Sequence, residues 1–384
     1  MRKMFGPINT LGIEIAGAAV RMVEVSRRNR RFEIVAATQQ PFAPPAGDMT
    51  TEAYWQALEA AIEKCLAGVR KRVKRAVLTF PSRNLISRQV RMPHMPEAEL
   101  RASLRWELEK YVPLSADDYV YDYLNQGVIE VEGDPMAQLL LVALPKEEVV
   151  RHFECLQGAG VTVTAVETAS FALSRLLNAM RENDLRTYGC LDIGDDRSTL
   201  TVFREGRVQF IRYIQLGAAR LEENLREIFP VEAATLRQML AETAVTSQAA
   251  ETERLGGLVA EDASASAGAV TMDEAPAGWM DGQNAEMQIL LQSFLSELIV
   301  EVRRSLDFYN LQYRDNSFAH LVLCGGLSRL RGIETYFSQE FKLPVSVLDM
   351  QTSLVAQIKP DCLERMTPDM AVVTGLALRA PEEE

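Results

Sequence analysis

The strongest constraint on the fold is a pattern that occurs twice in the chain. The stretch "TLGIEIAGAAVRMVEV" at 10–25 combines a strand with Glu14 near its end, a tight turn of small residues and a second strand. The stretch "GCLDIGDDRSTLTVF" at 189–203 aligns with it without a gap and places Asp192 at the position of Glu14. Alternating apolar residues indicate strands. A repeat at this distance predicts two related domains rather than a solenoid of short units.

Helical periodicity follows each copy of the repeat. Apolar residues recur at helical spacing in 52–69, in 217–229 and in 286–313. The last of these stretches leads into "HLVLCGGLSRLRGIETYFSQEF" at 320–341, which combines a strand, a Gly-Gly turn and a helix. Because strands alternate with helices, the sequence predicts an α/β fold with mixed sheets.

One stretch outside the repeat has the composition of a small folded unit. Its helix, "MPEAELRASLRWELEKYVP", carries Leu100, Leu104 and Leu108 on one apolar stripe, and several strands follow it. We interpret this stretch as an inserted α+β subdomain. The predicted organisation is a discontinuous first domain at 1–91 and 167–187, the inserted subdomain at 92–166, and a second domain at 188–384.

A second stretch outside the repeat lies at 243–285. It is rich in Ala, Ser, Thr and Gly and holds seven acidic residues against the single basic residue Arg254. Few large apolar residues are available there to bury, so we expect a flexible acidic insertion within the second domain.

Composition excludes several classes of function. The net charge of -12 argues against a nucleic-acid-binding surface. We interpret the basic runs at 27–31 and 70–75 as solvated edges, with a patch for anionic lipid or an acidic partner as the alternative. The five cysteines include no CxxC pair, and the three histidines are isolated, so a disulfide framework and a zinc site are both disfavoured.

The apolar runs of the chain are shorter than the roughly 18 residues that a membrane-spanning helix needs. The first twenty residues faintly resemble a signal peptide, but Glu14 interrupts the apolar part, and a strand is the better interpretation. We therefore expect a cytoplasmic protein whose membrane association comes only through a partner.

The two acid-bearing turns and the late Gly-Gly turn resemble the actin-like ATPase superfamily. Within it, the chain is similar to the PilM family, the cytoplasmic actin-like component of type IV pilus assembly, and the resemblance covers nearly the whole chain outside 243–285. The segments that carry it, in family order, are "LGIEIAGAAVRMVEVSR", "MPEAELRASLRWELEKYVP", "CLDIGDDRSTLTVF", "CGGLSRLRGIETYFSQEFKLPVSVLD" and "DMAVVTGLALR". The resemblance implies a two-domain, ribonuclease H-like fold with an SHS2-like inserted subdomain, and a role in pilus biogenesis and twitching motility.

The resemblance also implies a site for ATP and Mg²⁺. The phosphates would be bound by Glu14, Ala16, Gly17, Ala18, Ala19 and Arg21 in a first loop, and by Asp192, Gly194, Arg197, Ser198 and Thr199 in a second. The adenosine would contact Gly217, Arg237, Gly325, Gly326, Leu327 and Ser328. Glu14 and Asp192 would hold Mg²⁺ through its hydration shell.

Several of these residues depart from the family pattern. Glu14 stands where most relatives have Asp, Ala16 where a Gly would allow the closest approach to a phosphate, and Arg21 where Lys is frequent. Arg237 also replaces a usual Lys. We therefore expect the first loop to be the weaker half of the site, with weak hydrolysis or none. The sequence identifies no catalytic residue, since the candidates Glu14, Asp192, Glu222 and Glu223 all have simpler roles in a metal shell or on a helix face.

The resemblance further implies protein partners. In the family, the N-terminal tail of the inner-membrane protein PilN docks between the first domain and the inserted subdomain. Here the groove would be lined by Arg88, Val90, Met92 and Val163. Other pilus platform proteins and self-association are also implied.

Our leading hypothesis is an ATP-binding cytoplasmic scaffold that recruits a PilN-like membrane protein. The alternatives are a nucleotide-free scaffold that only binds protein partners and a filament protein similar to the division protein FtsA. The latter usually carries a C-terminal amphipathic membrane helix, which "RAPEEE" does not resemble. A sugar kinase is disfavoured because no acid suited to a base role stands where those kinases carry it.

Overall fold

The structure is a computed structural model of the 384-residue chain. It describes residues 8–17, 19–28, 31–42, 51–69, 75–113, 115–180, 187–229, 231, 236, 239–240, 243, 245, 277–313 and 318–380. Ala18, Arg237, residues 29–30 of the first basic run, residues 70–74 of the second and most of the acidic insertion lie outside these residues. Within the described helices, none is both long and apolar enough to cross a membrane.

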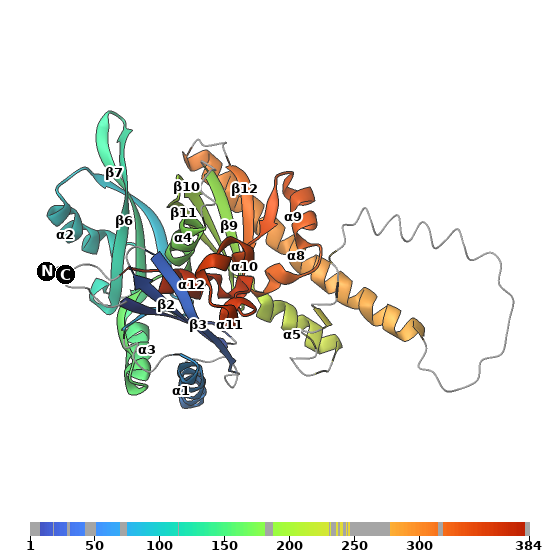
Figure 1. Ribbon diagram of the computed structural model, residues 1–384. Helices are drawn as coiled ribbons and strands as arrows, with labels where there is room; N and C mark the ends of the chain where they lie inside the picture. The colour runs from blue at the N-terminus through green and yellow to red at the C-terminus, as the bar shows by residue number, and fades with distance from the viewer. Residues whose placement is uncertain are drawn as a thin grey trace, which may run out of the picture. The chain divides into compact units, whose positions relative to one another are not determined.

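The first sheet is built on the first copy of the repeat (Figure 1). Its strands are β1 (Ile8–Ile15), β2 (Ala19–Arg28), β3 (Arg31–Pro41), β4 (Arg75–Thr79) and β8 (Thr162–Val166), in the order β3-β2-β1-β4-β8. The pairs β1–β2 and β2–β3 are antiparallel because short turns join them, whereas β4 pairs with β1 and β8 in parallel. The sheet is therefore mixed.

The second sheet repeats this order with the second copy. Its strands are β9 (Thr187–Ile193), β10 (Ser198–Arg204), β11 (Arg207–Ile214), β12 (Phe318–Cys324) and β13 (Val345–Val347), in the order β11-β10-β9-β12-β13. Its helices are α5 (Ala218–Ile228), α8 (Ala277–Tyr313), the 3-10 turn η3 (Gly326–Arg329) and α9 (Ile333–Phe341). The two copies of the sequence repeat, which align without a gap, thus begin two sheets with the same strand order.

The helices that accompany the first sheet come from distant parts of the chain. They are α1 (Glu52–Ala67), α3 (Lys146–Gly158), α4 (Ala169–Ala179), α10 (Met350–Ser353), α11 (Pro360–Leu363) and α12 (Ala371–Ala377), with 3-10 turns η4 (Val355–Gln357) and η5 (Pro368–Met370). Thr51 caps α1 by accepting a hydrogen bond from the Tyr54 amide. The buried face of α1 packs with α3 on the apolar core of the first sheet.

The stretch between β4 and β8 forms the small sheet of the inserted subdomain. Its elements are β5 (Ile86–Pro93), α2 (Glu97–Leu108), the 3-10 turn η2 (Ala116–Asp118), β6 (Tyr119–Val131) and β7 (Asp134–Pro145), with the antiparallel strand order β5-β7-β6. Glu132 and Gly133 turn the β6–β7 hairpin with positive φ angles of 54° and 94°. Leu100, Leu104 and Leu108 bury the predicted stripe of α2 in the core of this subdomain.

The molecule divides into two compact units. Unit 1 comprises Met1–Cys190, Thr201–Arg212 and Asp349–Glu384, and unit 2 comprises Leu191–Leu200 and Tyr213–Leu348. The segment that begins at Asp349 therefore groups with unit 1, whereas the sequence assigned it to the second domain. The physical reason is α12, which packs against β1, β2 and α4 of unit 1.

Helix α12 is buried along its whole length, and two glycines make its position possible. A Cβ atom on Gly12 of β1 would collide with the Val373 carbonyl oxygen and lie 2.7 Å from the Ala377 amide nitrogen. A Cβ atom on Gly375 would collide with the backbone of Ala172 in α4. Figure 1 shows α12 beside β2 although the two elements come from opposite ends of the chain.

We predict that Gly12→Ala lowers the free energy of unfolding by roughly 2–3 kcal/mol, because the added methyl group meets backbone atoms that cannot move aside independently. Urea unfolding measures this difference. Gly158→Ala is the matched control, since a Cβ atom there meets no heavy atom within 4 Å. Wild-type stability in Gly12→Ala would contradict the close approach of α12 to β1.

His152 joins α3 to the first sheet through an aromatic cluster. Its ring stacks on Phe80 with centroids 3.9 Å apart and meets Trp55 edge-on at 5.0 Å. Nδ1 donates a hydrogen bond to the Glu148 carbonyl oxygen at 2.7 Å, and Nε2 has no hydrogen-bond partner among the described residues. Burial lowers the pKa of His152 to about 4, because the charged form loses its hydration, although the bond to Glu148 opposes this shift.

We predict a stability loss between pH 7 and pH 5 that depends on His152. The unfolded state binds a proton near pH 6.5, whereas the folded state resists protonation down to about pH 4, so stability falls as the pH falls through this range. The contribution amounts to about 2 kcal/mol between pH 7 and pH 5. Urea unfolding at both pH values should show a correspondingly smaller loss for His152→Phe, with His94→Gln as the exposed-histidine control. An unchanged loss in His152→Phe would refute this assignment.

Candidate functional site

The first loop closes as a tight turn between β1 and β2. The Ala16 amide donates to the Ala19 carbonyl oxygen at 2.8 Å, so this amide is engaged within the turn. Glu14 and Arg21 are direct cross-strand partners in the antiparallel pair, which places their side chains on the same face of the sheet. The turn thus brings together two of the predicted phosphate-site residues.

A third residue, which the sequence analysis did not single out, completes a charge cluster with them. Arg21 Nη1 lies 3.6 Å from Glu14 Oε2, and Arg21 Nε lies 3.6 Å from Asp369 Oδ2. Asp369 belongs to η5, directly before α12, and accepts a hydrogen bond from the Thr367 hydroxyl at 2.5 Å. The side chains of Arg21, Glu14 and Asp369 are 11%, 13% and 10% exposed. The only signal in the sequence was the acid in "DMAVVTGLALR".

This arrangement does not fit Mg²⁺ at the first loop. A hydrated divalent cation needs carboxylate oxygens that are available to it or to its water ligands. Here the Glu14 carboxylate faces a guanidinium, and that guanidinium also faces Asp369. Over the described part of the chain, no group of three or more His, Cys, Asp or Glu side chains is placed to hold a metal ion.

The second loop, between β9 and β10, supports the start of α5. The Ala218 and Ala219 amides donate to the carbonyl oxygens of Gly194 and Asp195, each at 2.9 Å. A Cβ atom on Gly217 would lie 2.5 Å from the Arg197 amide nitrogen, so glycine is required where the loop meets the helix. Free amides at a helix N-terminus can bind phosphate, but these two are already satisfied by the loop.

The hydroxyl-bearing residues of this loop point into the protein. Ser198 is fully buried and donates to the Leu216 carbonyl oxygen at 2.7 Å, and Thr199 is 5% exposed. The Arg197 guanidinium lies 4.5 Å from the centre of the Tyr213 ring, a cation–π arrangement. In this structure the loop therefore uses Ser198 for internal support.

The Gly-Gly turn after β12 forms a cradle beside Asp192. Gly325 has φ of 85°, and a Cβ atom there would lie 2.5 Å from the Ile193 carbonyl oxygen and 2.6 Å from Asp192 Oδ1. Gly326 faces open space, with no heavy atom within 4 Å of its Cβ position. Ser328 donates to the Gly325 carbonyl oxygen at 2.7 Å, and both Ser328 and Leu327 are buried. The turn is therefore closed by Ile193 and Asp192 at Gly325 and open at Gly326.

The residues predicted to line a partner groove are not gathered at an open surface. Val90 and Met92 are buried in the core of the inserted subdomain, and Val163 packs against the core of the first sheet. Arg88 alone is exposed. The reason is the alternation along β5, which turns Val90 and Met92 toward α2.

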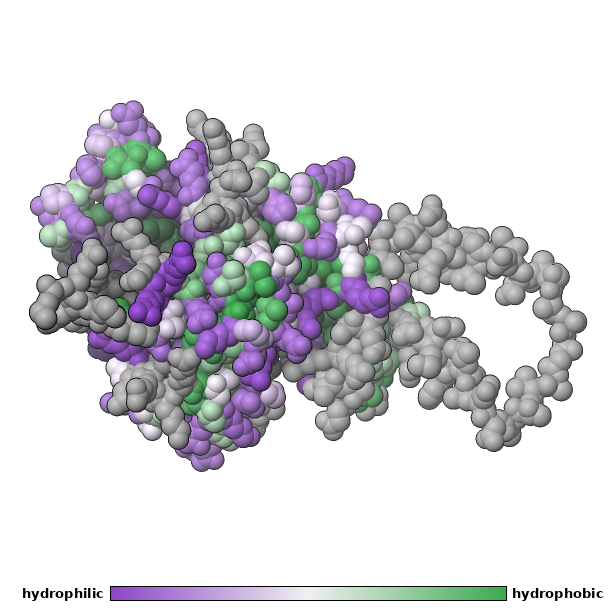
Figure 2. Space-filling view, viewed as in Figure 1, coloured by the Kyte–Doolittle hydropathy of each residue, from purple (hydrophilic) through white to green (hydrophobic). Residues whose placement is uncertain are grey.

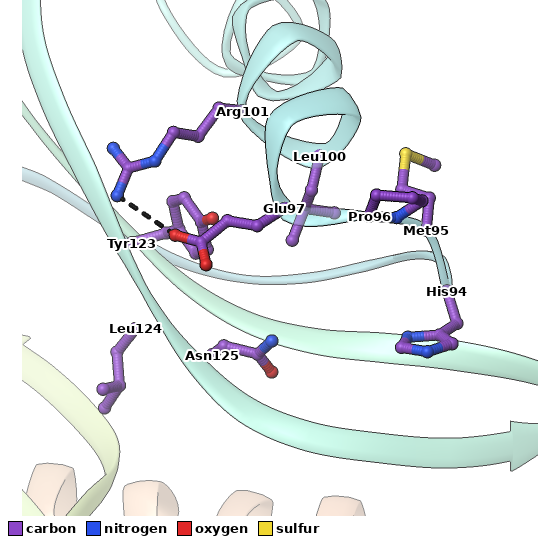
Figure 3. A pocket seen from close by; sticks show the side chains of 9 residues that line it. All are labelled: His94, Met95, Pro96, Glu97, Leu100, Arg101, Tyr123, Leu124 and Asn125. Atoms are coloured by element: carbon purple, nitrogen blue, oxygen red, sulfur yellow. Dashed lines mark hydrogen bonds and ion pairs between the residues drawn. The ribbon is translucent and has the colours of Figure 1, made fainter.

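The structure shows instead a cavity of about 740 Å³ between β6 and the start of α2 (Figure 3). Arg101 Nη2 lies 3.5 Å from Glu97 Oε1, and the Arg101 guanidinium lies 5.3 Å from the centre of the Tyr123 ring. The same subdomain leaves apolar side chains exposed among hydrophilic ones, as Figure 2 shows near the β6–β7 hairpin. The cavity is lined by His94, Met95, Pro96, Glu97, Leu100, Arg101, Tyr123, Leu124 and Asn125.

Glu222, one of the two catalytic candidates on α5, takes part in an ion pair within its own helix. Glu222 is 9% exposed and pairs with Arg226 on the same face of α5, with Oε2 3.1 Å from Nη2. This i,i+4 pair stabilises the helix. The structure accordingly adds no water-orienting role for Glu222.

Two mixed sheets of the same strand order, each opening with an acid-bearing turn, and the small inserted sheet define a protein of the actin-like ATPase fold. A family model described as type IV pilus assembly protein PilM matches residues 12–243 and 251–381. The chain therefore belongs to the PilM family, and the predicted fold class is confirmed.

Two solved structures have the same fold. The chain is similar to one from the PilM-PilN type IV pilus biogenesis complex, with 24% identity, 97% of this chain and 99% of that chain covered, and a TM-score of 0.74. It is also similar to the ethanolamine utilization protein EutJ from Carboxydothermus hydrogenoformans, with 11% identity, 98% and 91% covered, and a TM-score of 0.54.

Proposed function

We propose that this chain is a scaffold of the type IV pilus inner-membrane platform that acts on the cytoplasmic side of the membrane. It binds ATP, hydrolyses it weakly or not at all, and docks the N-terminal tail of a PilN-like membrane protein. The observation that carries this proposal is the PilM family match, which extends through both sheets and the inserted subdomain. The similar fold of a protein solved in complex with PilN supports the choice of partner.

The nucleotide part of the proposal is supported by unit 2. The open face of Gly326 accepts a flat base, and Asp192 lies beside the same turn. Phosphoryl transfer depends mainly on positioning and on neutralisation of charge. The first loop is poorly suited to that task, because its acid is paired with Arg21. These two observations support binding of ATP with little hydrolysis.

A second candidate function is a scaffold that binds no nucleotide. It is favoured by the internal use of polar groups in both loops. The Ala16 amide, the first two amides of α5 and the Ser198 hydroxyl all have partners within the protein. A phosphate would have to displace these bonds, which lowers the net gain from binding it.

We predict that wild-type protein binds ATP and that Gly326→Leu weakens binding at least tenfold, because the new side chain fills the space proposed for the base. Isothermal titration calorimetry at millimolar ATP measures both affinities. Gly158→Leu is the matched control, since it introduces the same side chain at another glycine with open space around it. The absence of heat and of a thermal shift with wild-type protein would leave only the nucleotide-free candidate.

The partner part of the proposal is assigned to the cavity of the inserted subdomain. Its lining combines apolar side chains such as Leu124 and Met95 with the polar side chains His94, Asn125 and Arg101. Such a lining suits a short segment with apolar side chains and an exposed backbone. Its volume of about 740 Å³ is in the range that holds a small ligand or a few residues of a peptide.

We predict that Asn125→Trp weakens binding of a PilN-like tail peptide at least tenfold, because Asn125 points into the cavity (Figure 3) and the indole fills it. Val120→Trp is the matched control: it places the same side chain on β6 at a half-exposed position that does not line the cavity. Fluorescence anisotropy with a labelled tail peptide measures both affinities. Undiminished binding by Asn125→Trp would place the docking surface elsewhere, and no binding by wild-type protein would refute the partner.

A further inference from the structure

The first loop carries a fixed positive charge at the place where this fold is expected to use a metal ion. Arg21 presents Nη1 to Glu14 and Nε to Asp369, each at 3.6 Å. All three side chains are about nine-tenths buried, so the two carboxylates need a positive charge close to them. The guanidinium supplies it from inside the chain.

The backbone fixes this arrangement independently of any ligand. Glu14 and Arg21 face each other because the β1–β2 ladder pairs them directly. Asp369 is held near them because η5 leads into α12, and α12 is packed against the backbone of Gly12. A strand pair and a buried helix therefore set the three positions, and a bound cation is not needed to assemble them.

A planar guanidinium also differs chemically from a hydrated cation in this place. It lies 3.6 Å from each of two carboxylates through separate nitrogen atoms and stays protonated at every relevant pH. Mg²⁺ would require the oxygens of Glu14 or their bound water, and it would lie close to the positive charge of Arg21. Repulsion between the two cations opposes metal binding in the wild-type protein.

We propose that Arg21 takes the place of the divalent cation in the first loop, so that this loop binds no metal through Glu14. The inference deepens the proposed nucleotide site, and only its consequence for ATP rests on the proposed function. Any dependence of nucleotide binding on Mg²⁺ would then come from Asp192 in the second loop.

The test uses Mn²⁺ as a probe on the full-length protein, with bound and free ions counted by electron paramagnetic resonance. Wild-type protein and Glu14→Gln should bind Mn²⁺ equally, and any wild-type binding should disappear in Asp192→Asn. Wild-type binding that is lost in Glu14→Gln but retained in Asp192→Asn would overturn the proposal.

Removal of the arginine provides a second, opposite readout. Arg21→Met should gain a Mn²⁺ site at least tenfold tighter than any binding through Glu14 in the wild type, because Glu14 and Asp369 are then left without their cation. The further change Asp369→Asn in that variant should abolish the gain. A folded Arg21→Met protein with no new site would overturn the proposal. If Arg21→Met fails to fold, the comparison of wild type with Glu14→Gln decides alone.

A final measurement separates this inference from the proposed function. The ratio of ATP affinities in Mg²⁺ and in EDTA should be the same for wild type and Glu14→Gln. A wild-type protein that binds no ATP refutes the nucleotide part of the proposed function, while the Mn²⁺ result still decides the role of Arg21.

Discussion

The close approach of α12 to β1 at Gly12 is the contact on which unit 1 depends. A strand and a helix backbone meet there without an intervening side chain, and only glycine leaves the space. The contact brings the C-terminal part of the described chain onto the first sheet. Further bonds hold it there: Arg175 donates to the Gly375 carbonyl oxygen at 2.7 Å, and Glu167 pairs with both Arg175 and Arg379. It also places Asp369 beside Arg21.

In both loops that the repeat predicts as phosphate-binding, the main polar groups contact other groups of the protein. In the first, a guanidinium lies between two carboxylates. In the second, the loop carbonyl oxygens cap α5, and the Ser198 hydroxyl is bonded to the backbone. Polar groups that already contact other groups of the protein stabilise one geometry of the loop and are less available to an anion. The Gly326 face differs because it remains open, and for this reason nucleotide binding is proposed there without efficient hydrolysis.

Much of the fold was accessible from the sequence, whereas the site was accessible only in part. Strand alternation, the helical stripe of α2 and the gap-free repeat predicted the mixed α/β sheets and the inserted unit. Val90 and Met92, which the sequence analysis placed in a groove, are buried under α2, because a single sequence does not show which face of β5 a helix covers. Asp369 was overlooked because its partner, Arg21, lies at the other end of the chain. Neither the cavity nor the ion-pair cluster follows from residue types alone.

What the sequence by itself determined is the repeated strand–turn–strand with its acid, since local alternation and small turn residues dictate that geometry. The pairing of Glu14 with Arg21 also follows from it, because a short turn fixes the register of a hairpin. Tertiary structure alone decided what surrounds that pair. Only the packing of α12 on Gly12 delivers Asp369 to Arg21, and this contact between distant segments turns a predicted metal-binding acid into part of an internal ion-pair cluster.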